Sequence, residues 1–177
     1  MSEVELDVLD LKEVVLTNNS FGPSDVTAIR KAISENYGHF GELRDAVSEM
    51  EEDESLSPAG RSKMGVCQFL LGRFADAIET LQNADGSAMA FFYQAAGMFE
   101  LGRYEDSIVA YEQAQKSGYD NDQCKIGIAE SHRYAGRVEK ALALLDDIFG
   151  PTEQTADYMY QRAATVAAVG GRMDEAI

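Results

Sequence analysis

Two histidines and the short acidic run at 120–122 are the first residues of this chain to consider as metal ligands. His39 and His132 lie far apart in the sequence, and neither belongs to the HExxH spacing of a zinc protease. The run 120–122 (DND) resembles the start of a calcium loop, but Cys124 and Lys125 occupy positions where such a loop needs a ligand and a glycine. We therefore expect His132 to be a packed, hydrogen-bonded side chain and the acidic run to cap a helix.

The other sequence patterns that carry catalysis are missing. The chain has no GxxxxGK[ST] phosphate loop, no GxGxxG and no GxSxG nucleophile turn. Its two cysteines, Cys67 and Cys124, form no CxxC pair and no disulfide framework, which is typical of a reducing compartment. We predict a protein that is not an enzyme and that uses no cofactor and no metal.

The charge of the chain narrows the class of partner. Fifteen basic residues face 31 acidic ones, so the net charge is −16, and residues 1–57 alone contribute −10 (4 bases against 14 acids). A field of this sign repels nucleic acid and anionic lipid, so we expect neither as a partner. The start of the chain has no signal-peptide pattern, and no apolar run reaches the roughly 18 residues that span a bilayer, so we expect a cytoplasmic protein.

One short pattern recurs along the chain. Residues 71–78 (LGRFADAI) return at 101–108 (LGRYEDSI), at 135–142 (AGRVEKAL) and at 170–177 (GGRMDEAI), and a weaker copy without the arginine stands at 41–47. Five copies at nearly one period indicate a repeat protein. The glycines that anchor the copies are separated by 31, 30, 34 and 35 residues: Gly41, Gly72, Gly102, Gly136 and Gly171.

The residues around each glycine favour a pair of antiparallel helices. An apolar helical stretch precedes the glycine, as at 88–101, and the glycine allows the left-handed backbone that commonly ends a helix. Acidic residues then open a second stretch whose apolar residues fall at helical spacing. A small residue in each second helix lets it approach the first closely: Ala46, Ala77, Ser107, Ala141 and Ala176.

This pattern resembles the tetratricopeptide repeat, a 34-residue helix–turn–helix unit. The slots of its first helix fall on Phe91, Gln94-Ala95 and Met98 in the clearest copy, and slots of its second helix fall on Ala77 and Leu81. The resemblance implies an all-α, right-handed solenoid of stacked helix pairs. We expect residues 1–23 to form an N-terminal cap or arm, and 24–177 to hold about five units, the last ending within its second helix.

In this family the first helix of each unit lines a concave groove, and the resemblance therefore implies a binding surface. The stretch 89–99 is apolar on all sides apart from Gln94, which is unusual for a helix with one face in water. Curvature could instead tuck some of these residues between helices. The expected groove residues are Val66, Phe69, Leu70, Met89, Phe92, Tyr93, Ala96, Phe99, Ile126 and Tyr134.

The ligand of this groove is expected to be an apolar or amphipathic segment of another protein. Some family members clamp a peptide carboxylate with Lys, Asn and Arg, but here no asparagine accompanies the bases of the first helices. We also expect the recurring turn arginines to be solvated and to bind no ligand. The residues concerned are Lys31, Lys63, Arg133 and Arg162 for the clamp, and Arg73, Arg103, Arg137 and Arg172 in the turns.

Our interpretation of the sequence is a non-enzymatic scaffold for protein–protein interaction. Two alternatives keep the fold: a secretion-type chaperone that sequesters a client segment, and a regulatory module of a longer protein. The first twenty residues could cap the first repeat, form a strand-like arm or fill the groove. The final repeat, if uncapped, could self-associate. The identity of the partner and the oligomeric state stay open.

Overall fold

The computed structural model describes residues 10–18 and 20–170, and every regular element within them is a helix. Residues 1–9 and the last repeat copy, 170–177, therefore lie wholly or almost wholly outside the described part. The elements are α1 (Leu11–Thr17), α2 (Pro23–Glu35), α3 (Gly38–Glu52), α4 (Pro58–Leu70), α5 (Phe74–Gln82), α6 (Ala88–Glu100), α7 (Tyr104–Lys116), α8 (Asn121–Tyr134), α9 (Val138–Asp146), the 3-10 helix η1 (Gly150–Gln154) and α10 (Ala156–Gly170). None of these helices is long and apolar enough to cross a membrane.

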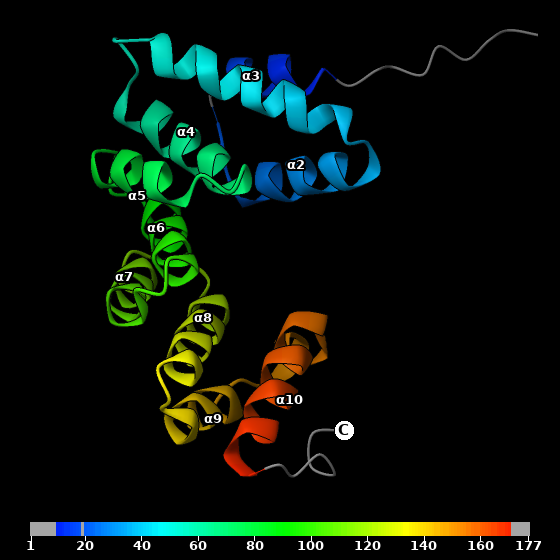
Figure 1. The fold of residues 1–177 in the computed structure, drawn as a ribbon, viewed down its shortest axis with the longest axis vertical. Coiled ribbons are helices and arrows are strands. Elements are labelled where there is room, and N and C mark those ends of the chain that lie inside the picture. Colours follow the sequence, from blue (N-terminus) through cyan, green and yellow to red (C-terminus); the bar gives the residue numbers. More distant parts are fainter. Residues whose placement is uncertain (1–9, 19, 171–177) are drawn as a thin grey trace, which may run out of the picture.

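From α4 onward the helices form the expected pairs. The pairs α4–α5, α6–α7 and α8–α9 follow one another along the long axis of the molecule, and α10 packs against α9 at the far end (Figure 1). Each pair buries its small residue completely: Ala77, Ser107 and Ala141 are each 0% exposed. The all-α solenoid predicted from the repeat is confirmed.

The glycine of each complete copy ends the first helix of its pair. Gly72, Gly102 and Gly136 have φ values of 77°, 73° and 76°, which a side chain would strain. In each turn the next N–H reaches back five residues, as in the bond from Arg73 N to the Gln68 carbonyl (2.9 Å). This is the Schellman arrangement, in which a left-handed residue lets the orphan carbonyls of a helix end find donors.

Gly41 does not have this role, and the expected turn at this copy is corrected by the structure. It lies inside α3, which begins three residues earlier at Gly38. The turn between α2 and α3 is made by Asn36, whose backbone is extended and whose side chain accepts a hydrogen bond from Gly38 N (2.9 Å). An asparagine that bonds its own backbone two residues on can close a turn without a left-handed glycine.

The N-terminal helix α1 packs on α3. Its Leu11 and Val15 are each 1% exposed and join the apolar cluster beneath that helix. Lys63 of α4 holds the other end of α1, because its ammonium donates to the carbonyls of Val15 (2.7 Å) and Asn18 (2.9 Å). These carbonyls lie at a helix C-terminus, where a cation is favourable.

Helix α2 lies over the first part of the concave side. Its Val26 is 2% exposed and belongs to one apolar cluster with Val66 of α4 and Tyr93 of α6. Its Ile29, also 2% exposed, packs into the cluster formed by α1 and α3. The apolar face of α2 thus covers residues of first helices that would otherwise line the groove.

Candidate partner-binding cleft

Beyond α2 the concave side opens into a cavity of about 640 Å³, which we call the concave cleft. Its walls come from α2, α6, α7, the turn before α8, α8 itself and the first turn of α10. In Figure 1 these elements run from the upper to the lower part of the molecule, with α2 and α10 on the same side. The lining residues are Pro23, Val26, Thr27, Arg30, Phe92, Tyr93, Ala96, Tyr111, Gly118, Tyr119, Asp120, Gln123 and Asp157.

Aromatic rings form one side of the cleft. The ring of Phe92 stacks on Tyr119 with centroids 4.1 Å apart and an interplanar angle of 16°. It also meets Tyr111 and Tyr93 edge-on, at 5.2 Å and 5.4 Å. Phe92, Tyr119 and Ala96 are only partly buried, so this apolar surface is open to a ligand.

Tyr111 reaches the cleft from a second helix because a glycine gives it room. A Cβ atom on Gly127 of α8 would lie 2.4 Å from Cζ of this ring, which is closer than side chains approach. The Tyr111 ring is 6% exposed, and burial raises the pKa of its hydroxyl, so the side chain is neutral at physiological pH.

Charged groups stand at the rim of the cleft. Asp120 caps α8, accepting from Gln123 N (2.8 Å), as expected for the DND run. Asp157 opens α10 on the same rim. Arg30 of α2 also lines the cleft, and its charge and its hydrogen bond oppose the rise that burial causes in the pKa of Tyr93.

A buried polar pair lies beside this rim, between α8 and α10. Arg133 donates to the Gln161 side chain (2.9 Å) and lies 3.5 Å from the carboxylate of Glu130. Burial raises the pKa of Glu130, and the nearby carboxylates of Asp157 and Glu100 raise it further, against the effects of Gln161 and Arg133. Negative charge is therefore in local excess here.

Comparisons with known proteins agree with this architecture. The tetratricopeptide repeat model matches residues 62–84, which span the α4–α5 pair from near its start to just beyond its end. The solved structure "MamA RS-1 ArsTM double mutant" has a TM-score of 0.64 at 14% identity and covers 85% of this chain and 88% of its own. "Crystal structure of MamA" gives 0.63 at 18%, covering 88% and 89%. The chain thus matches the tetratricopeptide repeat over its α4–α5 pair, and its fold as a whole is similar to that of these two structures.

A third solved structure has a similar fold, whereas the curated protein sequences contain no match. "Crystal structure of MamA protein" has a TM-score of 0.60 at 15% identity and covers 94% of this chain and 86% of its own. No curated protein matches at a significant level. At these identities the likeness concerns the fold alone.

The structure separates the expected groove residues into groups. Phe92, Tyr93 and Ala96 line the concave cleft. Val66 and Ile126 are buried (0% and 4% exposed) and have almost no surface to offer. The partly buried side chains of Phe69, Leu70 and Met89 pack against the cluster that contains Val26 of α2.

Phe99 and Tyr134, the remaining two, lie in a separate aromatic group at the α6–α7 turn. Their rings are 5.2 Å apart, and each is within 6 Å of Tyr104. Tyr134 is 52% exposed, and the guanidinium of Arg133 lies 4.6 Å from the centre of its ring. This group does not line the concave cleft.

Several residues of the cleft were missed from the sequence. The turn before α8 contributes Tyr119 and Asp120, and the first turn of α8 contributes Gln123. The spacing of apolar residues within helices does not predict that these positions line a cleft. Asp157 comes from the first turn of α10. Tyr111 was missed as well, although Gly127 offered a signal for it, since a glycine inside a helix, away from any turn, often marks a close approach.

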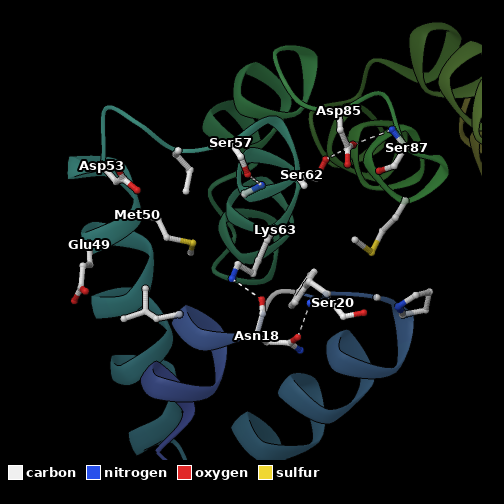
Figure 2. Close-up of a pocket in the computed structure, with 18 residues that line it drawn as sticks. Asn18, Ser20, Glu49, Met50, Asp53, Ser57, Ser62, Lys63, Asp85 and Ser87 are labelled. Atoms are coloured by element: carbon white, nitrogen blue, oxygen red, sulfur yellow. Dashed lines mark hydrogen bonds between the residues drawn. The ribbon is translucent and has the colours of Figure 1, made fainter.

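A second cavity, of about 660 Å³, lies at the start of α4 (Figure 2). Each of its charged side chains already has a partner within the chain. Asp85 accepts from Ser62 and from Ser87 N, as Figure 2 shows, and Lys63 holds the carbonyls of α1. Glu49 pairs with Lys12 (2.9 Å), and Asp53 accepts from Ser55. These contacts join four segments of the chain, which is a structural role.

The side chains that could have served catalysis or metal binding make structural contacts within the protein. His132 is partly buried, and its Nδ1 accepts from Arg137 Nε (2.8 Å), as a packed histidine should. Arg73 and Arg103 are not merely solvated, because they pair with Asp76 and Asp106 at 2.8 Å. Within residues 10–18 and 20–170, no three His, Cys, Asp or Glu side chains converge as metal ligands.

Proposed function

We propose that this repeat protein is a scaffold that holds an apolar or amphipathic segment of a partner protein in the concave cleft. The fold itself suggests protein–protein interaction, since stacked repeats create extended concave surfaces. The acidic net charge of −16 supports a protein partner over nucleic acid or an anionic membrane. A reducing, cytoplasmic setting is part of the proposal, supported by two buried, unpaired cysteines.

One observation supports this function most directly. Phe92, Ala96 and Tyr119 form an apolar platform that remains partly exposed on the inner side of the solenoid. A contiguous apolar surface at the centre of a concave face typically marks an interaction site, because aromatic anchors there lose water when a partner covers them.

Helix α2 indicates the form that a ligand would take. It is a single amphipathic helix whose Val26, Ile29 and Ala32, at 2%, 2% and 8% exposure, face the protein while its other side faces water. Spacings of three residues are those of an amphipathic helix bound in a groove. A partner helix beside α2 would extend the same packing onto Phe92 and Ala96.

Ala96→Gln tests this proposal without removing a core side chain. The longer side chain would occupy the cleft and leave the net charge unchanged. Peptides of about 16 residues, or roughly four helical turns, would first be selected on the wild-type protein from a random library. We expect selected peptides with apolar residues at helical spacing, and an affinity at least about tenfold lower for the variant, measured by fluorescence anisotropy.

Ala143→Gln is the matched control, because Ala143 is exposed on α9 and does not line the cleft. It makes the same substitution outside the cleft and should leave the affinity unchanged. Equal affinity for the wild type and Ala96→Gln, or equal losses in both variants, would contradict a binding site in the cleft.

A further inference from the structure

We infer that the concave cleft recognises a basic side chain, an arginine or a lysine, carried by the partner segment. This inference rests on the proposed function and specifies which kind of partner side chain the cleft recognises. It concerns the part of the cleft that is lined by the stacked rings of Phe92 and Tyr119 and by Asp120 and Asp157.

The first argument is the charge at this end of the cleft. None of the ion pairs found among residues 10–18 and 20–170 includes Asp120 or Asp157. Asp120 uses one oxygen to cap α8, which leaves its other oxygen for a ligand. The negative charge of Asp157 also acts on Glu130 of α8, whose pKa it helps to raise, and Arg133 lies beside Glu130 and Gln161. A cation would relieve this repulsion between like charges.

The second argument is the aromatic wall. Phe92 and Tyr119 stack as a pair, and Tyr93 stands edge-on to Phe92. The face of an aromatic ring attracts a guanidinium or ammonium group, and more strongly where water is partly excluded. The aliphatic stem of the same arginine or lysine would pack on Ala96, which is partly exposed beside these rings.

The cleft also holds one cation of the chain itself, with which a ligand cation would have to compete. Arg30 of α2 lines the cleft, and its positive charge opposes the rise in the pKa of both Tyr93 and Tyr119 that burial causes. None of the ion pairs among the described residues includes Arg30. A ligand cation in the cleft would be repelled by Arg30.

The test uses a probe that carries only the side chain in question. N-acetyl-arginine N-methylamide is titrated into the protein of residues 1–177, and the chemical shifts of its backbone amides are followed by NMR. Its neutral isostere, N-acetyl-citrulline N-methylamide, is the matched control. With the arginine probe we expect saturable chemical-shift changes at Tyr119, Asp120 and Gln123. The affinity of the citrulline probe should be lower by about tenfold or more.

Two sets of variants should change the affinity of the arginine probe in opposite directions. The double variant Asp120→Asn, Asp157→Asn keeps a residue that can cap α8 and should weaken binding of the arginine probe about tenfold. Arg30→Gln removes the competing cation and should strengthen binding about threefold. Asp106→Asn, in a turn outside the cleft, removes one negative charge elsewhere and should leave the affinity of the probe nearly unchanged.

Equal binding of the two probes, or an unchanged affinity in both the double aspartate variant and Arg30→Gln, would overturn the inference. Such a result leaves the proposed function intact if selected peptides still lose affinity for Ala96→Gln. Conversely, a bound arginine probe together with peptides that ignore Ala96→Gln would refute the apolar docking mode and keep the cation site.

Discussion

The two halves of the concave side are built from the same repeat but differ in what covers them. In the first half, Val66 of α4 is buried in one cluster with Val26 of α2. In the second half, formed by α6, α8 and α10, Phe92 and Ala96 stay partly exposed. Equivalent surfaces of the first helices therefore become core or binding surface according to whether another helix lies over them.

The polar groups of the two halves differ in the same way. Near the first half, the charged groups of the cavity at the start of α4 are all paired within the chain, as Lys63 and Asp85 show. In the second half, Asp120 accepts one hydrogen bond, from Gln123 N, and Asp157 belongs to none of the ion pairs found among the described residues. A region whose groups satisfy one another is structural, whereas one with spare apolar and charged surface is suited to a partner.

The largest expected effect tests whether the helix pairs are equally tight in both halves. Ala77→Arg and Ala141→Arg each place a charge in a position that is 0% exposed. Each should lower the free energy of unfolding by about 3–5 kcal/mol, since there is neither space nor a counter-charge. Thermal unfolding followed by circular dichroism checks this. Ala143→Arg, at an exposed position of α9, is the control and should melt close to the wild type.

Unequal losses at Ala77 and Ala141 would break the comparison. They would mean that the two halves differ in their core as well as in what covers their concave side. Wild-type melting of both variants would instead contradict the burial of the small residue in each pair.

The repeat itself could be predicted from sequence because its cause is local. Each complete copy has a glycine at the end of its first helix and a small residue in its second helix. As this pattern predicts, the backbone at Gly72, Gly102 and Gly136 is left-handed. The cleft was predicted only in part. Phe92 and Ala96 follow from helical spacing, but the cover over Val66 depends on where α2 lies, and residue spacing within α4 carries no information on that.

The next effect concerns the covered half. Val26→Ala removes two methyl groups from a side chain that is 2% exposed and should cost about 2 kcal/mol in the free energy of unfolding. Val109→Ala makes the same change at a position of α7 that is 66% exposed, and should cost less than about 0.5 kcal/mol. Urea denaturation measures both. Similar midpoints for the two variants would show that α2 contributes little to the cover over α4 and α6.

A smaller effect is expected in the open half. Tyr119→Ala removes a partly exposed ring that stacks on Phe92, and should cost about 1 kcal/mol. Tyr37→Ala is the matched control, because Tyr37 stacks on Phe40 but is 81% exposed. The loss at Tyr119 should exceed the loss at Tyr37 and stay below that of Val26→Ala. A loss larger than at Val26 would place Tyr119 in the core and remove it from the binding surface.

The smallest effect is a pH dependence that arises from the crowded carboxylates of the open half. Burial, together with Asp157 and Glu100, raises the pKa of Glu130 above its usual range. The folded protein then binds this proton more tightly than the unfolded chain does. The stability due to the group is complete below the pKa of an unfolded glutamate, about 4.3, and is lost as the pH rises through the folded pKa.

Glu130→Gln removes this titration while it keeps a polar side chain beside Arg133 and Gln161. Relative to the wild type, the variant should therefore become more stable at pH 7 than at about pH 4. Glu112→Gln, at an exposed position of α7, controls for the loss of one negative charge. Urea midpoints at the two pH values give the comparison. If the difference between wild type and Glu130→Gln has the opposite sign, the carboxylate is stabilised by Arg133 more than it is destabilised by burial and by Asp157, and the negative excess beside the cleft is compensated.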